Sequence, residues 1–83
     1  MYKITFRGRA DRQFQQIPPP HFRRVEQAID GLANDPRPHG AIKLTGETGY
    51  RLRVGDYRIL YDIDDTAQVV TVYRVGHRRE VYR

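Results

Sequence analysis

A tight hairpin around Gly55-Asp56 is the feature that most constrains the fold of this sequence. The dipeptide separates two runs rich in β-forming residues, Tyr50–Val54 and Tyr57–Ile63. Glycine at the first position of a two-residue loop favours a tight β-turn, which fixes how the two strands pair. The resulting pairs are Val54 with Tyr57, Arg53 with Arg58, Leu52 with Ile59, and Arg51 with Leu60.

This pairing predicts two chemically different sheet faces, because side chains alternate across a strand. The apolar face holds Tyr50, Leu52, Val54, Tyr57, Ile59, Tyr61 and Ile63. The other face gathers Arg51, Arg53 and Arg58. Directly opposed like charges destabilise a sheet, so the simplest reason to keep this pattern is a bound polyanion. We therefore expect the three arginines to line an open concave surface, with Leu60 and Tyr73 among them.

The N-terminal half reads as one strand followed by two helices. Tyr2–Phe6 alternates as a strand, and apolar residues then recur with helical spacing in two stretches. The first stripe is Ala10, Phe14 and Ile17, and the second is Phe22, Val25, Ala28, Ile29 and Leu32. The triple proline 18–20 separates the two helices, since proline ends one helix and is tolerated in the first turn of the next.

The C-terminal half completes a β-α-α-β-β-β order. The segment Pro36–Gly49 is predicted to be a loop in which Ile42 and Leu44 pack on the core, and Gln68–Val75 forms the last strand. Residues 1–83 are expected to form a single α+β domain. In this two-layer arrangement, a helical hairpin packs on one face of a mainly antiparallel sheet.

Charge and composition point to a nucleic-acid partner. Fifteen basic residues against ten acidic ones give a net charge of +5, and only Lys3 and Lys43 among the basic residues are lysines. Arginine suits bidentate phosphate contacts, and the six tyrosines could stack on bases. With no cysteine and no apolar run long enough to span a membrane, the sequence predicts a cytoplasmic protein without a membrane partner.

The segment after the last strand adds His77, Arg78, Arg79 and Tyr82 to the candidate site. Guanidinium groups can hold phosphates and stabilise the charge of a pentacovalent phosphorane. In RNA the 2′-hydroxyl is a built-in nucleophile that needs only alignment and proton transfer. Arginine stays protonated, whereas histidine titrates near neutral pH, so His77 is a candidate base. No metal or cofactor is expected, because His21, His39 and His77 are isolated in the sequence.

Three stretches together resemble the RelE/ParE toxin superfamily: Lys43–Gly46, Tyr50–Tyr61 and Val72–Tyr82. The closing Val-Gly-His-Arg-Arg-Glu-Val-Tyr is similar to the RelE branch, whose members are ribosome-dependent messenger RNA endonucleases. The resemblance implies cleavage of messenger RNA in the ribosomal A site by attack of the 2′-hydroxyl. It also implies a cognate antitoxin, with which the chain would form a hetero-oligomer.

Carried over position by position, the resemblance assigns roles to five residues. Arg51 and Arg53 would bind substrate and stabilise the transition state, and Arg58 would bind phosphate. Arg78 would serve the scissile phosphate and the leaving group, and Tyr82 would stack on the nucleotide. Further RNA contacts are expected from Arg74, Arg79 and Arg83. Better-known members carry lysines at the first two positions, so the general base here is His77, Tyr82 or a ribosomal group.

Two other functions stay open at the level of sequence. The ParE branch shares the fold and inhibits DNA gyrase without cutting RNA. A homologue that keeps only antitoxin binding is the third possibility. The set of Arg51, Arg53, Arg58, Arg78 and Tyr82 favours the endoribonuclease over both.

Overall fold

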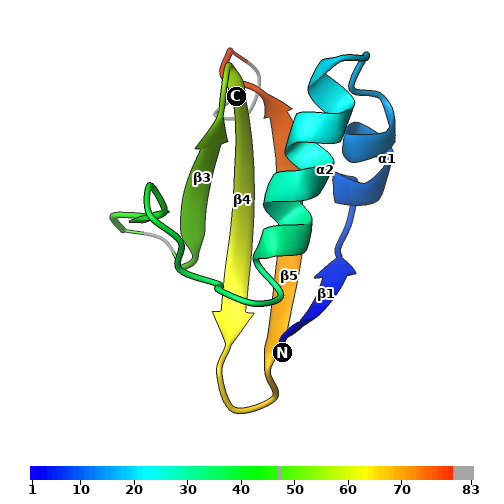
Figure 1. Cartoon of the computed structure of the whole chain (residues 1–83). Coiled ribbons are helices and arrows are strands. Elements are labelled where there is room, and N and C mark those ends of the chain that lie inside the picture. Colours follow the sequence, from blue (N-terminus) through cyan, green and yellow to red (C-terminus); the bar gives the residue numbers. More distant parts are fainter. Residues whose placement is uncertain (47, 80–83) are drawn as a thin grey trace.

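Two helices cover one face of a five-stranded sheet in the computed structural model, which describes residues 1–46 and 48–79. The elements are β1 (Lys3–Phe6), α1 (Ala10–Gln15), α2 (His21–Gly31), β2 (Ile42–Lys43), β3 (Tyr50–Val54), β4 (Tyr57–Asp64) and β5 (Val69–His77). The strand order is β1-β5-β4-β3-β2, and only the β1–β5 pair is parallel. The predicted α+β two-layer fold is confirmed (Figure 1).

The predicted hairpin register is confirmed pair by pair. Val54 lies opposite Tyr57 and Arg53 lies opposite Arg58. Gly55 has a φ of 60°, a left-handed conformation that glycine adopts without steric cost. A tight turn whose first central residue needs a positive φ therefore fixes the register of the whole β3–β4 ladder.

The core lies between the helices and the predicted apolar face of the sheet. Val25, Ile29 and Leu32 of the second helical segment are buried there against Leu52 and Ile59. Ala10 and Phe14 of α1, and Ile17 just past its end, also lie in this core, as their spacing predicted. Among the described residues, no helix is long and apolar enough to cross a membrane.

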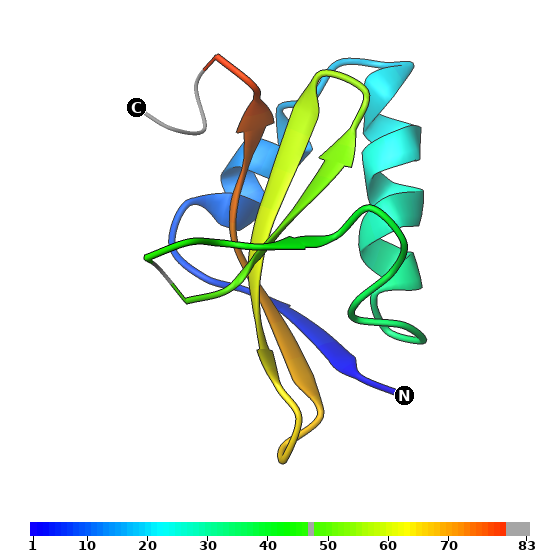
Figure 2. The same cartoon turned by 90° about the vertical axis from the view of Figure 1, so that its left-hand side faces the viewer.

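Part of the segment between α2 and β3 crosses the other face of the sheet (Figure 2). Thr48 accepts a hydrogen bond from the Tyr73 hydroxyl at 3.4 Å. At Gly49, whose φ is 103°, a Cβ atom would lie 2.7 Å from the Tyr61 carbonyl oxygen. Only glycine permits this approach, so the segment is held close to β4 and β5.

The structure corrects the prediction for this segment in one respect. It contains the short strand β2, and Ile42, which was expected to pack on the core, is 51% exposed. Ile42 pairs with Arg51, so it lies on the sheet face away from the helices. The strand was missed because two residues carry too little alternation to be recognised. Leu44 is half-buried.

A polar cluster at the opposite end of the sheet from the hairpin turn holds this crossing segment. Arg37 donates two hydrogen bonds to Asp65, at 2.8 and 3.2 Å, and a third to the Tyr50 hydroxyl. The Tyr2 hydroxyl donates to the same carboxylate at 2.6 Å. These bonds, those from Arg37 foremost, lower the pKa of Asp65 to about 2.

Acid is therefore expected to weaken the fold through Asp65. A carboxylate whose pKa is depressed on folding adds stability above its unfolded pKa of 3.8, and this stability is lost as the pH falls toward 2. Asp65→Asn should flatten the fall in melting temperature between these pH values, measured by circular dichroism. The exposed Asp30→Asn is the matched control. Equal acid profiles for wild type and Asp65→Asn would contradict the assignment.

Candidate functional site

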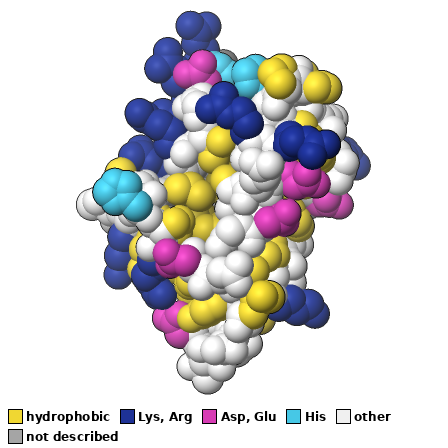
Figure 3. Space-filling model, viewed as in Figure 1, with side chains coloured by type: hydrophobic (Ala, Val, Ile, Leu, Met, Phe, Trp, Pro, Cys, Tyr) yellow, Lys and Arg dark blue, Asp and Glu magenta, His cyan; other side chains and the backbone are white. Residues whose placement is uncertain are grey.

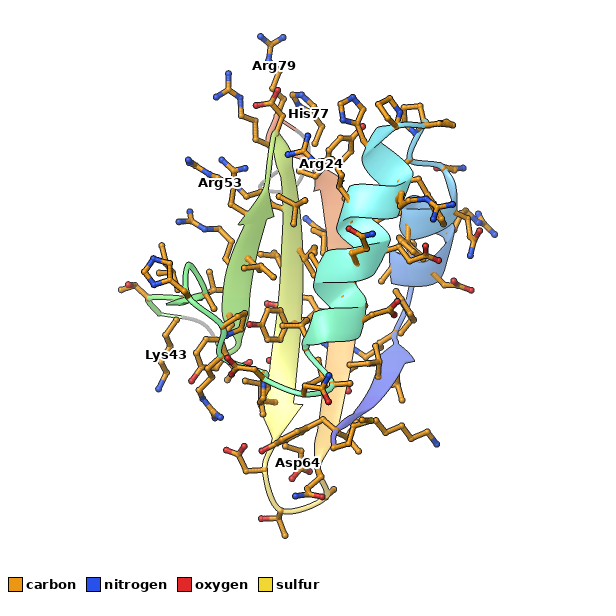
Figure 4. The ribbon with its side chains drawn as sticks, in the orientation of Figure 1. Arg24, Lys43, Arg53, Asp64, His77 and Arg79 are labelled. Atoms are coloured by element: carbon orange, nitrogen blue, oxygen red, sulfur yellow. The ribbon has the colours of Figure 1, made fainter. Side chains whose placement is uncertain are left out.

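The arginine face is the name we give to the sheet surface away from the helices that carries Arg51, Arg53 and Arg58. Arg53 and Arg58 are paired directly across β3 and β4, next to the Gly55-Asp56 turn. Arg53 is exposed and lies on the side of β3 away from α2 (Figure 4). Basic side chains gather along this side of the molecule in the space-filling view (Figure 3). The sheet thus concentrates positive charge at the hairpin end.

Arg58 departs from the prediction of an open position, because its side chain is only 6% exposed. Leu60, also expected on the open surface, is 4% exposed. The Arg58 Nη1 atom donates to the turn carbonyls of Tyr57 at 3.3 Å and Gly55 at 3.5 Å. The guanidinium therefore supports the turn as well as adding charge beneath Arg53.

Arg78 is brought to the same turn by the chain that leaves β5. Its backbone N–H donates to the Asp56 carbonyl oxygen at 2.7 Å. Arg78 and its neighbour Arg79 are both exposed. The chain just after β5 therefore lies beside the hairpin turn, as this bond shows for its backbone. Arg74 joins the same face through its pairing with Leu60.

A β-bulge in β5 sends His77 to the other side of the sheet. The register of β4 and β5 shifts between Leu60 and Tyr61, which leaves Tyr73 as an extra residue on β5. Beyond the bulge, His77 pairs with Tyr57 of the apolar face, and their rings meet edge to face at 5.8 Å. Figure 4 shows His77 at the end of the sheet where α2 begins.

The hydrogen bond of the His77 ring also bears on its predicted role. The Nδ1 atom accepts the backbone N–H of Arg79 at 3.3 Å. An accepting Nδ1 places the proton of a neutral ring on Nε2, an assignment that follows from the bonding pattern. The Nδ1 lone pair, which is the basic site of this tautomer, is then engaged by the Arg79 N–H. Position and bonding both weigh against His77 as the base.

Some predicted features lie outside what the structure describes or were missed. Tyr82 and Arg83 belong to residues 80–83, outside the described part of the chain. Within the described residues, no group of three or more His, Cys, Asp or Glu side chains could hold a metal ion.

Sequence reasoning missed Arg9, Gln13 and Gln16, which line a groove beside β5. Their i, i+4, i+7 spacing, with Arg9 and Gln16 at the two caps of α1, forms a polar stripe that could have signalled the groove.

The comparisons with known proteins agree with this fold. Residues 4–82 match the family described as the ParE toxin of type II toxin-antitoxin systems. Toxin RelG of Mycobacterium tuberculosis is 34% identical over 84 residues, covering 99% of this chain and 97% of RelG.

Two solved structures are similar over nearly the whole chain. The toxin-antitoxin complex RelBE2 of Mycobacterium tuberculosis contains a chain with 31% identity and a TM-score of 0.80, covering 93% of this chain and 98% of that one. The isolated RelE toxin of E. coli has 26% identity and a TM-score of 0.81, covering 99% of this chain and 92% of RelE.

Proposed function

Since this chain belongs to the RelE/ParE superfamily of toxins from type II toxin-antitoxin systems, we propose that it is an endoribonuclease of the RelE type. It cleaves messenger RNA in the ribosomal A site and thereby stops translation. The observation that carries this proposal is the arginine face. Arg53 opposes Arg58 beside the turn to which the Arg78 backbone is bonded. Opposed cations that cost stability are explained by an anionic substrate.

The proposed mechanism uses the substrate's own 2′-hydroxyl as the nucleophile. Arg51 and Arg53 bind the phosphates that flank the scissile bond and stabilise the extra negative charge of the phosphorane. Arg58 adds charge from beneath, and Arg78 serves the scissile phosphate and the leaving 5′-oxygen. Arg74, Arg79 and Arg83 extend the binding surface, and Tyr82 stacks on a base to hold the attacking ribose. The products carry 2′,3′-cyclic phosphate and 5′-hydroxyl ends.

The arginine face also fits the surface that an antitoxin would cover. The RelBE2 relative was solved as a toxin-antitoxin complex, and RelE is known in such a complex from E. coli. We propose a cognate antitoxin whose inhibitory segment combines acidic residues with apolar ones. The acidic residues would meet the arginines, and Ile42, exposed beside Arg51, offers an apolar contact.

His77→Gln is expected to slow cleavage by less than roughly tenfold, because general-base catalysis contributes about 10²–10⁴ and the ring lies off the arginine face. Single-turnover cleavage on purified ribosomes measures this. A loss of a hundredfold or more would restore His77 as the base. The expected result leaves Tyr82 or a ribosomal group as the proton acceptor.

A gyrase inhibitor of the ParE type is the second candidate, favoured by the description of the family that the chain matches. One pair of assays separates the two. Primer extension on translating ribosomes should reveal cleavage within the A-site codon, and DNA supercoiling by gyrase should be unaffected. Inhibition of supercoiling without cleavage would select the ParE function instead.

A further inference from the structure

The α1–β5 groove is a second polar site beside the arginine face. It has a volume of about 540 Å³, within the range of small-molecule pockets. Arg9, Gln13 and Gln16 of the α1 segment line one side, and Tyr57, Arg74 and His77 line the other. Arg9 and Arg74 bring positive charge to it, and none of the described residues that line it is acidic.

The walls of the groove are fixed by the way α1 covers β5. Strand β1 pairs only with residues Val69 to Val72, which leaves the end of β5 without a neighbouring strand on that side. The Gln13 side-chain oxygen accepts the Val75 N–H at 2.9 Å and so satisfies this edge. Val75 itself is 2% exposed. This bond holds the polar stripe of α1 against β5 and makes the groove a preformed feature.

The lining combines the groups that recognise a nucleotide. The Tyr57 ring contacts the rings of His21, at 5.5 Å, and His77, at 5.8 Å, and these contacts form an aromatic wall. Aromatic rings stack on bases, guanidinium groups bind phosphates, and glutamine amides bond to base edges. Arg9 is exposed and lies on the opposite wall from the rings.

The groove continues from the arginine face around the edge of β5. Gly76, which lines the groove, pairs with Arg58, and Arg74, which also lines it, pairs with Leu60. The bulge at Tyr73 turns the next residues toward the helices, so one short stretch of β5 belongs to both surfaces. A strand of RNA that crosses the arginine face at its hairpin end would reach the groove next.

We propose that the α1–β5 groove is a nucleotide subsite that holds one nucleotide of the single-stranded RNA next to the one cleaved on the arginine face. Its phosphate would meet Arg9 and Arg74, and its base would lie against Tyr57 and His77 with the glutamines at its edge. The identification of RNA as the natural ligand rests on the proposed function. The expected affinity of the groove for a nucleotide is independent of that function.

Adenosine 5′-monophosphate, titrated into the free protein and followed by NMR, tests the subsite without ribosomes. Saturable shifts are expected at the backbone amides of residues 9–16 and 74–77, with a dissociation constant in the millimolar range or below. Inorganic phosphate and adenosine should each bind more weakly than the nucleotide. Arg9→Ala should weaken binding roughly tenfold, the size expected for a lost charge-assisted hydrogen bond.

Arg12→Ala is the matched control, because Arg12 is an exposed arginine of the same helix that does not line the groove. It should leave the affinity unchanged, whereas Gln16→Glu, which adds a negative charge at the groove, should weaken it. The proposal would be overturned if the Arg9 and Arg12 variants lost affinity equally, or if phosphate bound as tightly as the nucleotide. Shifts confined to residues 51–58, or shifts that do not saturate, would overturn it as well. Nucleotide binding in the groove without cleavage of ribosomal messenger RNA would leave the subsite standing and refute the proposed function.

Discussion

Arg53→Ala is expected to slow cleavage of ribosome-bound messenger RNA about a hundredfold or more while the domain stays as stable as the wild type. Removing one preorganised donor to a charged transition state typically costs about 10²–10³ in rate. Arg53 is exposed and opposes Arg58, so its loss removes a repulsive pair. The melting temperature should therefore be unchanged or slightly higher. Single-turnover cleavage and thermal unfolding of the same preparations measure both effects.

Arg24→Ala is the control for a change in net charge alone. Arg24 is exposed on α2, which covers the other face of the sheet (Figure 1). Its removal should change cleavage little. A rate within threefold of wild type for Arg53→Ala would contradict the role of the arginine face, and so would an equal loss in the Arg24 variant.

Arg58→Ala would be a poorer probe of the same idea. Its side chain is 6% exposed and bonds to the turn carbonyls, so truncation removes packing and hydrogen bonds as well as charge. The pattern of the sequence alone suggests that this variant stays folded and is even slightly more stable. The burial reverses that expectation, and Arg58→Ala should lower the melting temperature.

The hairpin could be predicted from sequence because its information is local. A glycine that adopts a positive φ at position 55 selects the turn, and the turn sets every pair from Val54–Tyr57 to Tyr50–Tyr61. The helical stripes were equally readable, since Val25, Ile29 and Leu32 are buried as their spacing predicts.

What covers the arginine face could not be read from alternation. A period of two residues says which side chains share a face, but not which other segment crosses it. The path of the segment before β3 depends on tertiary contacts, such as the close approach of Gly49 to the Tyr61 carbonyl. Alternation placed Arg58 and Leu60 on this face but did not reveal that both are buried.

The position of His77 shows how one extra residue changes a site. With strict alternation from the buried Val70 and Val72, His77 would lie on the arginine face. The bulge at Tyr73 inverts the alternation, so the buried Val75 and His77 lie on the helix side instead. Nothing in the sequence marks Tyr73 as a bulge. The prediction of His77 as the base depended on a β5 strand without such a bulge.

Replacing the 2′-hydroxyl at the cleaved position is expected to have the largest effect of all. The proposed mechanism has no other nucleophile, since arginine stays protonated and supplies only charge. A single 2′-deoxy nucleotide leaves the phosphates and bases intact, so binding to the arginine face is preserved while the attack becomes impossible. Cleavage should fall below detection with little change in binding.

The most direct measurement of the central claim uses two messenger RNAs that differ in this one atom. Each is placed on ribosomes with the same codon in the A site, the purified chain is added, and primer extension maps the breaks. We predict a break within the A-site codon of the all-ribose message and none in its 2′-deoxy counterpart. Cleavage of both messages, or of neither, would contradict the proposal that this chain cuts messenger RNA by attack of the RNA's own 2′-hydroxyl.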